Sequence, residues 1–415
     1  LDEFLEEFTE CVSRKDYRAA MDACRRQLHN TPDNRYVLDM RKSLETFMDA
    51  AEELEEVQDE AQDKAPSDTE ESAFEDLADE AALACDRAYE AMFAYLDEDR
   101  LWSVGEQAVG IFWDTGQLEL PGPRRDRLHW MAQQLLRGLT QRLEQSGKEG
   151  QMPQASAANE LGLSRSEWLF EGLGQLWFHK ELDIPAPAWL HDGCAEELRR
   201  FEGNMEELAG HSLAGLHKAS SGDLCDVLMQ VWTVERSLVV GLFGDTDAVP
   251  ALEYGVREVL AEIRRRPLIP PPKEGFYHCF YLVTHVVYTL NCFNGCLPNR
   301  RSDCPWLYSY LERCLEFWMM MAESSVKDNA AWQSEAVDAI AESVDCLRGL
   351  GEKEETVVRA CRWLLSRQEG DGFFKSPQAR PAANEYDCLH PTWTAVAALQ
   401  LNRQAPGPSR LCCIW

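Results

Sequence analysis

The sequence predicts an all-α protein, and three observations carry that prediction. Amphipathic segments of about 12–20 residues recur along the chain, with apolar residues at the three- and four-residue spacing of a helix. The alternation of Val, Ile and Thr with polar residues that indicates β-strands is scarce. Stretches rich in Gly, Pro and Asp separate the amphipathic segments. Because the chain has 415 residues, 45% of them hydrophobic, it can bury a large core and is expected to hold more than one domain.

The charge balance excludes two classes of partner. The chain has 72 Asp and Glu against 41 Lys and Arg, so its formal net charge is −31. Nucleic acids and anionic membrane surfaces are bound by clustered Lys and Arg, and the acidic balance of this chain argues against both. The apolar runs are also too short to span a bilayer.

The cysteine usage indicates the compartment. Fifteen cysteines are scattered along the chain, often inside apolar helical patterns, which is typical of reduced and buried thiols. We therefore expect a soluble, intracellular protein. The chain begins with Leu1 rather than Met, so we also expect that an N-terminal targeting segment is missing from it.

The first element is a helical segment at residues 15–34, KDYRAAMDACRRQLHNTPDN. It resembles the second helix and exit turn of a tetratricopeptide repeat, although Lys15 stands where that family prefers Gly. The resemblance implies a surface that recruits a protein partner. An amphipathic helix pair without that role explains the same pattern equally well. Residues 55–76 follow as an acidic linker.

Long helices are expected next at residues 77–96 and 127–145. Residues 148–163, KEGQMPQASAANELGL, have the composition of a boundary, and helical patterns resume from 164 to 266. The stretch 264–275, RRRPLIPPPKEG, predicts a rigid polyproline-like entry into the next element.

The most unusual element is the helix predicted at Phe276–Phe293, because it contains no Lys, Arg, Asp or Glu. An ordinary surface helix has a charged face opposite its apolar stripe. Here the polar face consists of imidazole, phenol and thiol groups, which tolerate burial. Such a helix is expected to be enclosed, with this face toward a polar surface or a cavity. The face combines five residues at helical spacing: His278, Tyr281, His285, Tyr288 and Cys292.

Further helices are expected at residues 306–322, 332–347 and 355–367, and a final helix is expected to open at Pro391. Two segments in this part carry a resemblance. Arg359–Phe373, with its Trp-Leu pair, Gln368 and Asp-Gly-Phe end, resembles the QW repeat of squalene and terpene cyclases. Tyr386–Leu399 is similar to the start of the inner helix that follows that turn in cyclases and in protein prenyltransferase β subunits.

This resemblance implies an α/α toroid, in which paired helices surround a central cavity. The Asp-x-Asp-Asp acid of the cyclases is missing, since the nearest segment, Gly244–Asp247, lacks its last Asp. The magnesium-binding Asp cluster of class I terpene synthases is missing as well. His390 occupies a place like that of the distant zinc ligand of prenyltransferases, whereas Asp387 and Cys388 are immediate neighbours instead of being two residues apart. We therefore expect five segments along the chain: a tetratricopeptide-like segment at 1–54, the acidic linker at 55–76, a helical segment at 77–147, the toroid at 148–402 and a tail at 403–415.

Histidines on the predicted inner helices are the leading site candidates, because His, Cys and carboxylates bind zinc, iron or copper. His278 and His285 are about 10 Å apart along one helix at roughly 1.5 Å per residue, which is too far for both to bind one ion. We therefore expect His285 to meet His390. The alternative is a hydrogen-bonded core formed by the same histidines and the neighbouring tyrosines. The candidate catalytic residues are His285, Asp387, Tyr281 and Tyr288, and the candidate metal ligands are His285, His390, His278 and Cys388.

Three other patterns are interpreted as structural. Glu335, Asp338, Glu342 and Asp345 lie apart from the apolar face of their helix and are expected to form a solvated face. Glu385 and Asp387 precede the expected final helix, and we expect one of them to cap it. The spacing of Cys292, Cys296 and Cys304 begins like a zinc site but offers no fourth ligand.

These observations predict an enzyme that binds a small apolar or aromatic molecule, such as an isoprenoid, in the toroid cavity. The chemistry would be acid–base catalysis or would depend on a divalent transition metal, with the metal preferred. The competing hypothesis is a non-catalytic helical scaffold with a degenerate toroid and a repeat-mediated protein partner.

Overall fold

The structure is a computed structural model of the 415-residue chain. It describes Arg26 and residues 68–146, 164–243, 251–293, 304–324, 330–351, 355–378 and 384–401. The chain divides into two compact units, Leu1–Asp68 and Thr69–Trp415. The predicted repeat at 15–34, the boundary at 148–163 and the tail lie outside the described residues, apart from Arg26.

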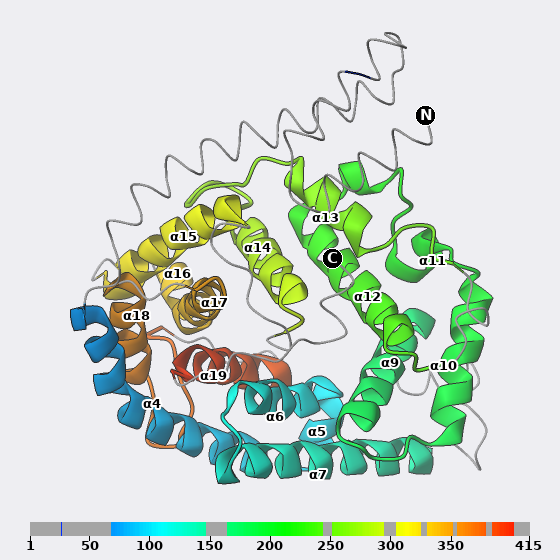
Figure 1. Cartoon of the computed structure of the whole chain (residues 1–415), viewed down its shortest axis with the longest axis horizontal. Helices are drawn as coiled ribbons and strands as arrows, with labels where there is room; N and C mark the ends of the chain where they lie inside the picture. Colours follow the sequence, from blue (N-terminus) through cyan, green and yellow to red (C-terminus); the bar gives the residue numbers. More distant parts are fainter. Residues whose placement is uncertain are drawn as a thin grey trace. The chain divides into compact units, whose positions relative to one another are not determined.

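The prediction of an all-α protein is confirmed for the described residues, in which an isolated bridge between Gln368 and Phe374 is the one β-type pairing. Figure 1 shows the helices and their labels. From the start of the unit to residue 209 the helices are α4 (Asp68–Tyr95), α5 (Glu98–Val104), α6 (Gln107–Leu118), α7 (Pro123–Ser146), α9 (Arg165–Glu181), α10 (Ala188–Phe201) and α11 (Met205–Ala209). After a short 3₁₀ turn come α12 (Ser221–Val239), α13 (Val256–Arg264), α14 (Phe276–Leu290), α15 (Pro305–Glu323), α16 (Ala330–Ser334), α17 (Ala336–Gly349), α18 (Glu355–Leu365) and α19 (Glu385–Leu399).

Local sequence signals fix several of these boundaries. Ser164 and Ser220 each form a capping box, in which the hydroxyl accepts from a backbone N–H and the side chain of Glu167 or Asp223 accepts in return. Helix α19 is capped by Asn384, whose side chain accepts from the backbone N–H of Asp387. The helix therefore begins at Glu385 rather than at Pro391, and Pro391 lies inside it.

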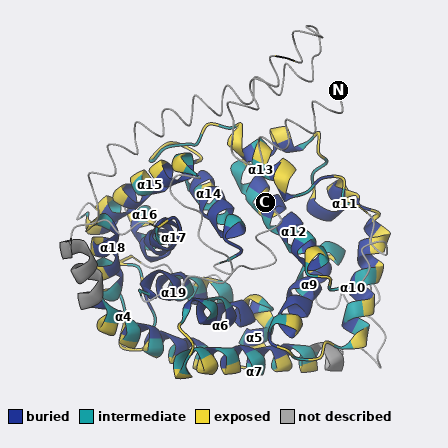
Figure 2. Ribbon diagram, in the orientation of Figure 1, coloured by how far each residue is buried: buried dark blue, intermediate teal, exposed yellow. Residues whose placement is uncertain are grey.

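Helix α17 is the most deeply enclosed element near the site. It packs against α14, α15, α18 and α19, which surround it in Figure 1. The side chains from Ala336 to Leu347 are all buried, as the uniform dark blue of α17 in Figure 2 shows. Its small Ala and Ser residues allow neighbours on several sides to approach closely, because a short side chain leaves room for the neighbour's backbone. The predicted single helix at 332–347 is in fact two, since the chain breaks at Glu335 between α16 and α17.

Helix α14 is enclosed along most of its length, as predicted, but it ends at Leu290. Cys292 and Phe293 have positive φ angles of 53° and 52°, so they belong to a left-handed turn. Cys292 therefore does not extend the polar face of the helix, which corrects that part of the predicted stripe. Of the remaining residues of this face, His278, Tyr281 and His285 line a cavity.

The turn after α18 joins this part of the fold to α4. The amide nitrogen of Gln368 donates to the carbonyl oxygens of Ala84 (2.7 Å) and Gly372 (3.0 Å), and its amide oxygen accepts from Arg87 at 3.0 Å. The side chain thus connects α18 to the neighbouring helix α4, rather than capping its own helix. Gly372 is required here because its φ is +91° and a Cβ would lie 2.9 Å from the backbone oxygen of Arg87.

Candidate functional site

A cavity of about 1170 Å³ lies where α12, α14, α17 and α19 meet. The N-terminal end of α12, the polar face of α14, the α16–α17 junction, the turn after α18 and the first turns of α19 form its wall. Helices α14, α17 and α19 are seen close together in Figure 1, and α17 contacts both of the others. The volume slightly exceeds the roughly 300–1,000 Å³ that is typical of small-molecule sites.

The cavity collects most of the residues that the sequence singled out. Tyr288 does not line it, because its ring is buried and stacks on Phe293 at 5.5 Å between ring centroids. The predicted residues that do line the cavity are His278, Tyr281, His285, Asp387, Cys388 and His390.

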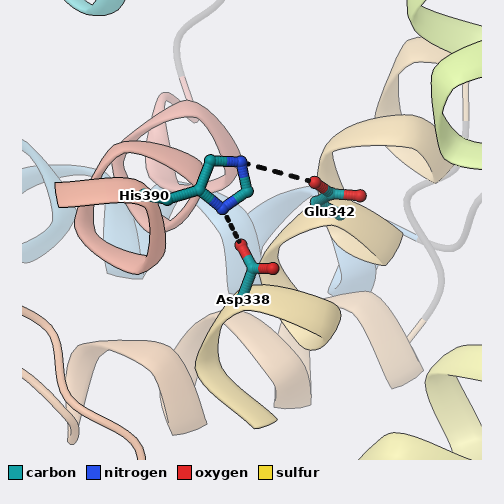
Figure 3. Close-up of side chains that lie close together, drawn as sticks. All are labelled: Asp338, Glu342 and His390. Atoms are coloured by element: carbon teal, nitrogen blue, oxygen red, sulfur yellow. Dashed lines mark ion pairs between the residues drawn. The ribbon is translucent and has the colours of Figure 1, made fainter. Parts of the chain in front are cut away.

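The chemically densest part of the site is a group of three side chains, Asp338, Glu342 and His390, which we call the Asp–Glu–His group. Figure 3 shows that the two carboxylates project from α17 toward the imidazole, which comes from α19. His390 Nδ1 lies 2.9 Å from Asp338 Oδ1, and His390 Nε2 lies 3.9 Å from Glu342 Oε1. The carboxylates can share one partner because residues four apart lie on the same face of a helix.

Asp338 contacts two further side chains besides His390. The Tyr281 hydroxyl donates to Asp338 Oδ2 at 2.5 Å, and the Thr394 hydroxyl donates to Asp338 Oδ1 at 2.9 Å. Since His390 also contacts Oδ1, both oxygens of Asp338 have partners. Glu342 differs, because its Oε2 atom is buried and accepts no hydrogen bond from the described residues. An unpartnered buried carboxylate oxygen is costly and indicates a missing proton donor or cation.

The three members of the Asp–Glu–His group differ in how readily they give up a proton. Burial opposes ionisation of Asp338, but the His390 charge and the hydrogen bonds from His390, Tyr281 and Thr394 outweigh it and lower the pKa of Asp338. Burial likewise opposes the charge on His390, yet the nearby carboxylates raise its pKa to about 9. Burial and the adjacent Asp338 raise the pKa of Glu342 to about 8. Near neutral pH the group is therefore an ion pair beside a protonated carboxyl.

The Asp–Glu–His group could hold a metal ion. Each member offers one ligand atom, and these atoms all lie within 4.8 Å of one another. Carboxylate oxygen and imidazole nitrogen are ligand types for zinc and iron. Among the residues that the structure describes, this is the one group of three or more His, Cys, Asp and Glu with such spacing.

The other predicted metal ligands lie outside this group. His285 Nδ1 donates to the carbonyl of Tyr281 at 2.8 Å, and burial lowers the pKa of His285. His278 is exposed to the cavity, and its ring contacts Tyr277 edge to face. Cys388 lies on the first turns of α19 and lines the cavity. The structure thus unites His390 with two carboxylates of α17, and His285 lies nearby on α14.

The prediction that Glu335, Asp338, Glu342 and Asp345 form a solvated face is wrong for three of the four. Asp338, Glu342 and Asp345 are 7%, 1% and 2% exposed. The helical pattern separated them correctly from the apolar face, but it could not show that α17 has neighbours on its polar face as well. One signal was present: from Ala336 to Leu347 the helix has no Lys or Arg and only short or acidic side chains opposite its apolar stripe.

The capping prediction for the last helix also needs correction. Glu385 and Asp387 lie in the first turn of α19, and Asn384 performs the capping. Glu385 accepts a hydrogen bond from the Tyr95 hydroxyl, which ties α19 to the end of α4. Gly244–Asp247 and Cys296 lie outside the described residues, so the predictions made for them stay predictions.

Comparison with known proteins identifies no relative: no family model matches the chain, and neither a curated protein nor a solved structure is significantly similar to it. The resemblance to cyclases and prenyltransferases therefore remains an inference from two short segments. None of the helices in the described part of the chain is long and apolar enough to cross a membrane.

Proposed function

We propose that the protein is an enzyme whose cavity binds a small molecule beside a divalent metal ion held by the Asp–Glu–His group. The observation that carries the proposal is the group itself: three ligand atoms within 4.8 Å of one another, next to a cavity of about 1170 Å³. Two of its members, Asp338 and His390, line that cavity. A metal beside a cavity of this size can polarise a bound molecule or acidify a bound water.

The ligand set favours zinc or iron over copper(I). Two carboxylates and one imidazole suit zinc and iron, whereas copper(I) prefers thiolate and thioether donors. The imidazole of His390 lies between the two carboxylates, with Nδ1 at Asp338 and Nε2 directed toward Glu342. A metal would replace the protons that His390 and Glu342 now retain, and binding should therefore strengthen as the pH rises toward 8 and 9.

The fold in which this site acts is proposed to be the cyclase-like α/α toroid. Two contacts support that interpretation. Gln368 connects α18 to α4 through the turn that resembles the QW repeat, and the helix resembling a cyclase inner helix, α19, delivers His390 to the cavity. The proposal does not extend to cyclisation through an Asp-x-Asp-Asp acid.

A second candidate is acid–base catalysis without a metal. It is favoured by the pKa of Glu342, which burial and Asp338 raise to about 8, so that a neutral carboxylic acid stands beside the Asp338–His390 ion pair at neutral pH. A carboxyl tuned in this way can act as a general acid. In that case the three residues are complete without a cation.

The deciding experiment is elemental analysis of protein purified without chelators, together with zinc and iron(II) titrations of the chelator-treated protein. We expect one zinc or iron per chain, lost in Glu342→Gln and in His390→Ala. His278→Ala is the matched control, because His278 lines the same cavity but lies outside the group. Circular dichroism of each variant separates loss of the metal from loss of the fold.

The possible results separate the three hypotheses. Metal-free protein that binds neither ion overturns the metal proposal. If the Glu342→Gln protein then loses turnover of a substrate found by screening, the acid–base candidate replaces it. If the wild type and both variants are metal-free and equally stable, and Glu342→Gln leaves turnover unchanged, both enzyme candidates fail and the scaffold hypothesis gains.

A further inference from the structure

The cavity wall is acidic, and almost no positive charge opposes it. Among the described residues that line the cavity, Lys375 is the one Lys or Arg, and its Nζ is paired with Asp371 Oδ2 at 2.6 Å. The wall is therefore negative over much of its surface, and an anionic ligand would enter against that charge. The carboxylate residues of the wall are Asp223, Asp226, Glu335, Asp338, Asp371 and Asp387.

The carboxylates of this wall differ in what they contact among the described residues. Asp338 is paired with His390 and Asp371 with Lys375, and the carboxylate of Asp223 accepts from the backbone N–H of Ser220 at 2.7 Å. Asp226 and Glu335 form no ion pair with any described residue, and Asp226 is exposed to the cavity. They are free to pair with a positively charged ligand.

Aromatic rings lie beside the free carboxylates. Tyr277 and Tyr281 contact each other edge to face at 4.8 Å between ring centroids, and the Tyr277 hydroxyl lies 3.5 Å from Glu335 Oε2. The Tyr277 ring also contacts that of His278 at 5.8 Å. Neutral aromatic faces attract cations, and carboxylates next to them add to that attraction.

The N-terminus of α12, which also lines the cavity, is not free for an anion. Ser220, Gly222 and Asp223 form this part of the wall. Backbone N–H groups at the start of a helix favour a phosphate. However, the Ser220 hydroxyl accepts from the N–H of Asp223, and the Asp223 carboxylate already occupies this end with its negative charge.

From this wall we propose that the cavity takes an organic cation, an amine or quaternary ammonium compound with an apolar or aromatic body, held between Tyr277, Tyr281 and Glu335. This inference rests on the proposed function, since it names the substrate class of the same cavity. It also separates the protein from enzymes that act on diphosphates, because the described wall offers no free Lys or Arg for a phosphate.

The test compares ligands of one shape and different charge on the full chain. Benzyltrimethylammonium and benzyl phosphate are titrated by calorimetry, and choline is compared with its neutral isostere 3,3-dimethylbutan-1-ol. We expect each quaternary ammonium compound to bind, choline at least about tenfold more tightly than its isostere, and benzyl phosphate not to bind. Equal affinities for choline and its isostere, or preferred binding of the phosphate, would overturn the inference.

Two substitutions in the cavity wall test where the cation binds. Glu335→Gln and Tyr277→Leu should each weaken benzyltrimethylammonium binding by about three- to tenfold. Asp192→Asn is the matched control, because this carboxylate on α10 is exposed and lies outside the cavity wall. Unchanged binding in both cavity variants would refute the location.

The metal content of every sample is measured, which keeps the two proposals apart. Cation binding by chelator-treated protein supports the substrate class even if no metal is ever retained. Metal binding without cation binding sustains the proposed metal centre and overturns the substrate class.

Discussion

Replacing Glu342 with Gln tests the electrostatics of the site directly. The substitution keeps the shape of the side chain and removes its ionisation. In the folded protein burial and Asp338 raise the pKa of Glu342 from 4.5 to about 8. Between these two values the unfolded chain releases a proton that the folded protein retains, so the unfolding free energy of the wild type falls as the pH rises. The amide of the variant has no such proton to release, so the variant should escape this part of the loss.

The size of the effect follows from the rise in pKa. At about 1.4 kcal/mol for each tenfold change in proton affinity, the rise corresponds to roughly 5 kcal/mol, and sharing of the proton with His390 and Asp338 reduces it to about 2–4 kcal/mol. The raised pKa of His390, about 9, adds a second decline between its unfolded value of 6.5 and that pH. Because His390 is present in both proteins, comparison of variant with wild type largely removes that second decline.

The assay is urea denaturation of metal-free protein at about pH 5.5 and about pH 8.5. The quantity of interest is the stability of Glu342→Gln minus that of the wild type, which should rise by about 2–4 kcal/mol from the lower to the higher pH. Glu316→Gln, on the exposed face of α15, is the control and should show no such rise. A difference that stays constant with pH would show that Glu342 is ionised in the folded protein, and the reasoning about the group would fail.

Three further substitutions test the contacts that hold the site in place, each by urea denaturation. Gly372→Ala should lower the free energy of unfolding by about 1–3 kcal/mol, because φ is +91° and the Cβ would lie 2.9 Å from a backbone oxygen of α4. Gly370→Ala is the control and should cost clearly less, because a Cβ there meets nothing within 4 Å. Gln368→Ala should cost about 1–3 kcal/mol, since it leaves the Ala84 carbonyl without its 2.7 Å donor; an unchanged midpoint would contradict this role. His390→Ala should cost about 3–5 kcal/mol in metal-free protein at neutral pH, because it leaves the buried Asp338 carboxylate without its cation. An unchanged stability would mean that water reaches this carboxylate freely.

The sequence predicted the elements around the site well. The lack of charge in Phe276–Phe293 correctly indicated an enclosed helix with a polar face, and His278, Tyr281 and His285 on that face do line a cavity. The expected end of that helix was too late, because a left-handed turn at Cys292 is a property of the backbone that an apolar pattern does not reveal. Similarly, Pro391 looked like a helix start, yet Asn384 provides a cap more than one turn before it.

The partners of His390 could not be predicted in the same way. Its expected partner was His285, whereas its nearest partners are Asp338 and Glu342. A helical pattern tells which residues share a face, but it does not tell how many neighbours cover that face. Asp338 and Glu342 were assigned to solvent because charged residues opposite an apolar stripe usually lie there.

By itself, then, the sequence determined the helical class, the polar face of α14 and the presence of His390 on a helix that follows the turn with Gln368 and Gly372. These depend on residue type and spacing, which act over a few turns of chain. The tertiary structure alone decided that α17 is covered on all sides and that its carboxylates meet His390 from α19. That meeting joins residues about 50 positions apart along the chain through helix packing, and the packing determines the burial that sets their charges.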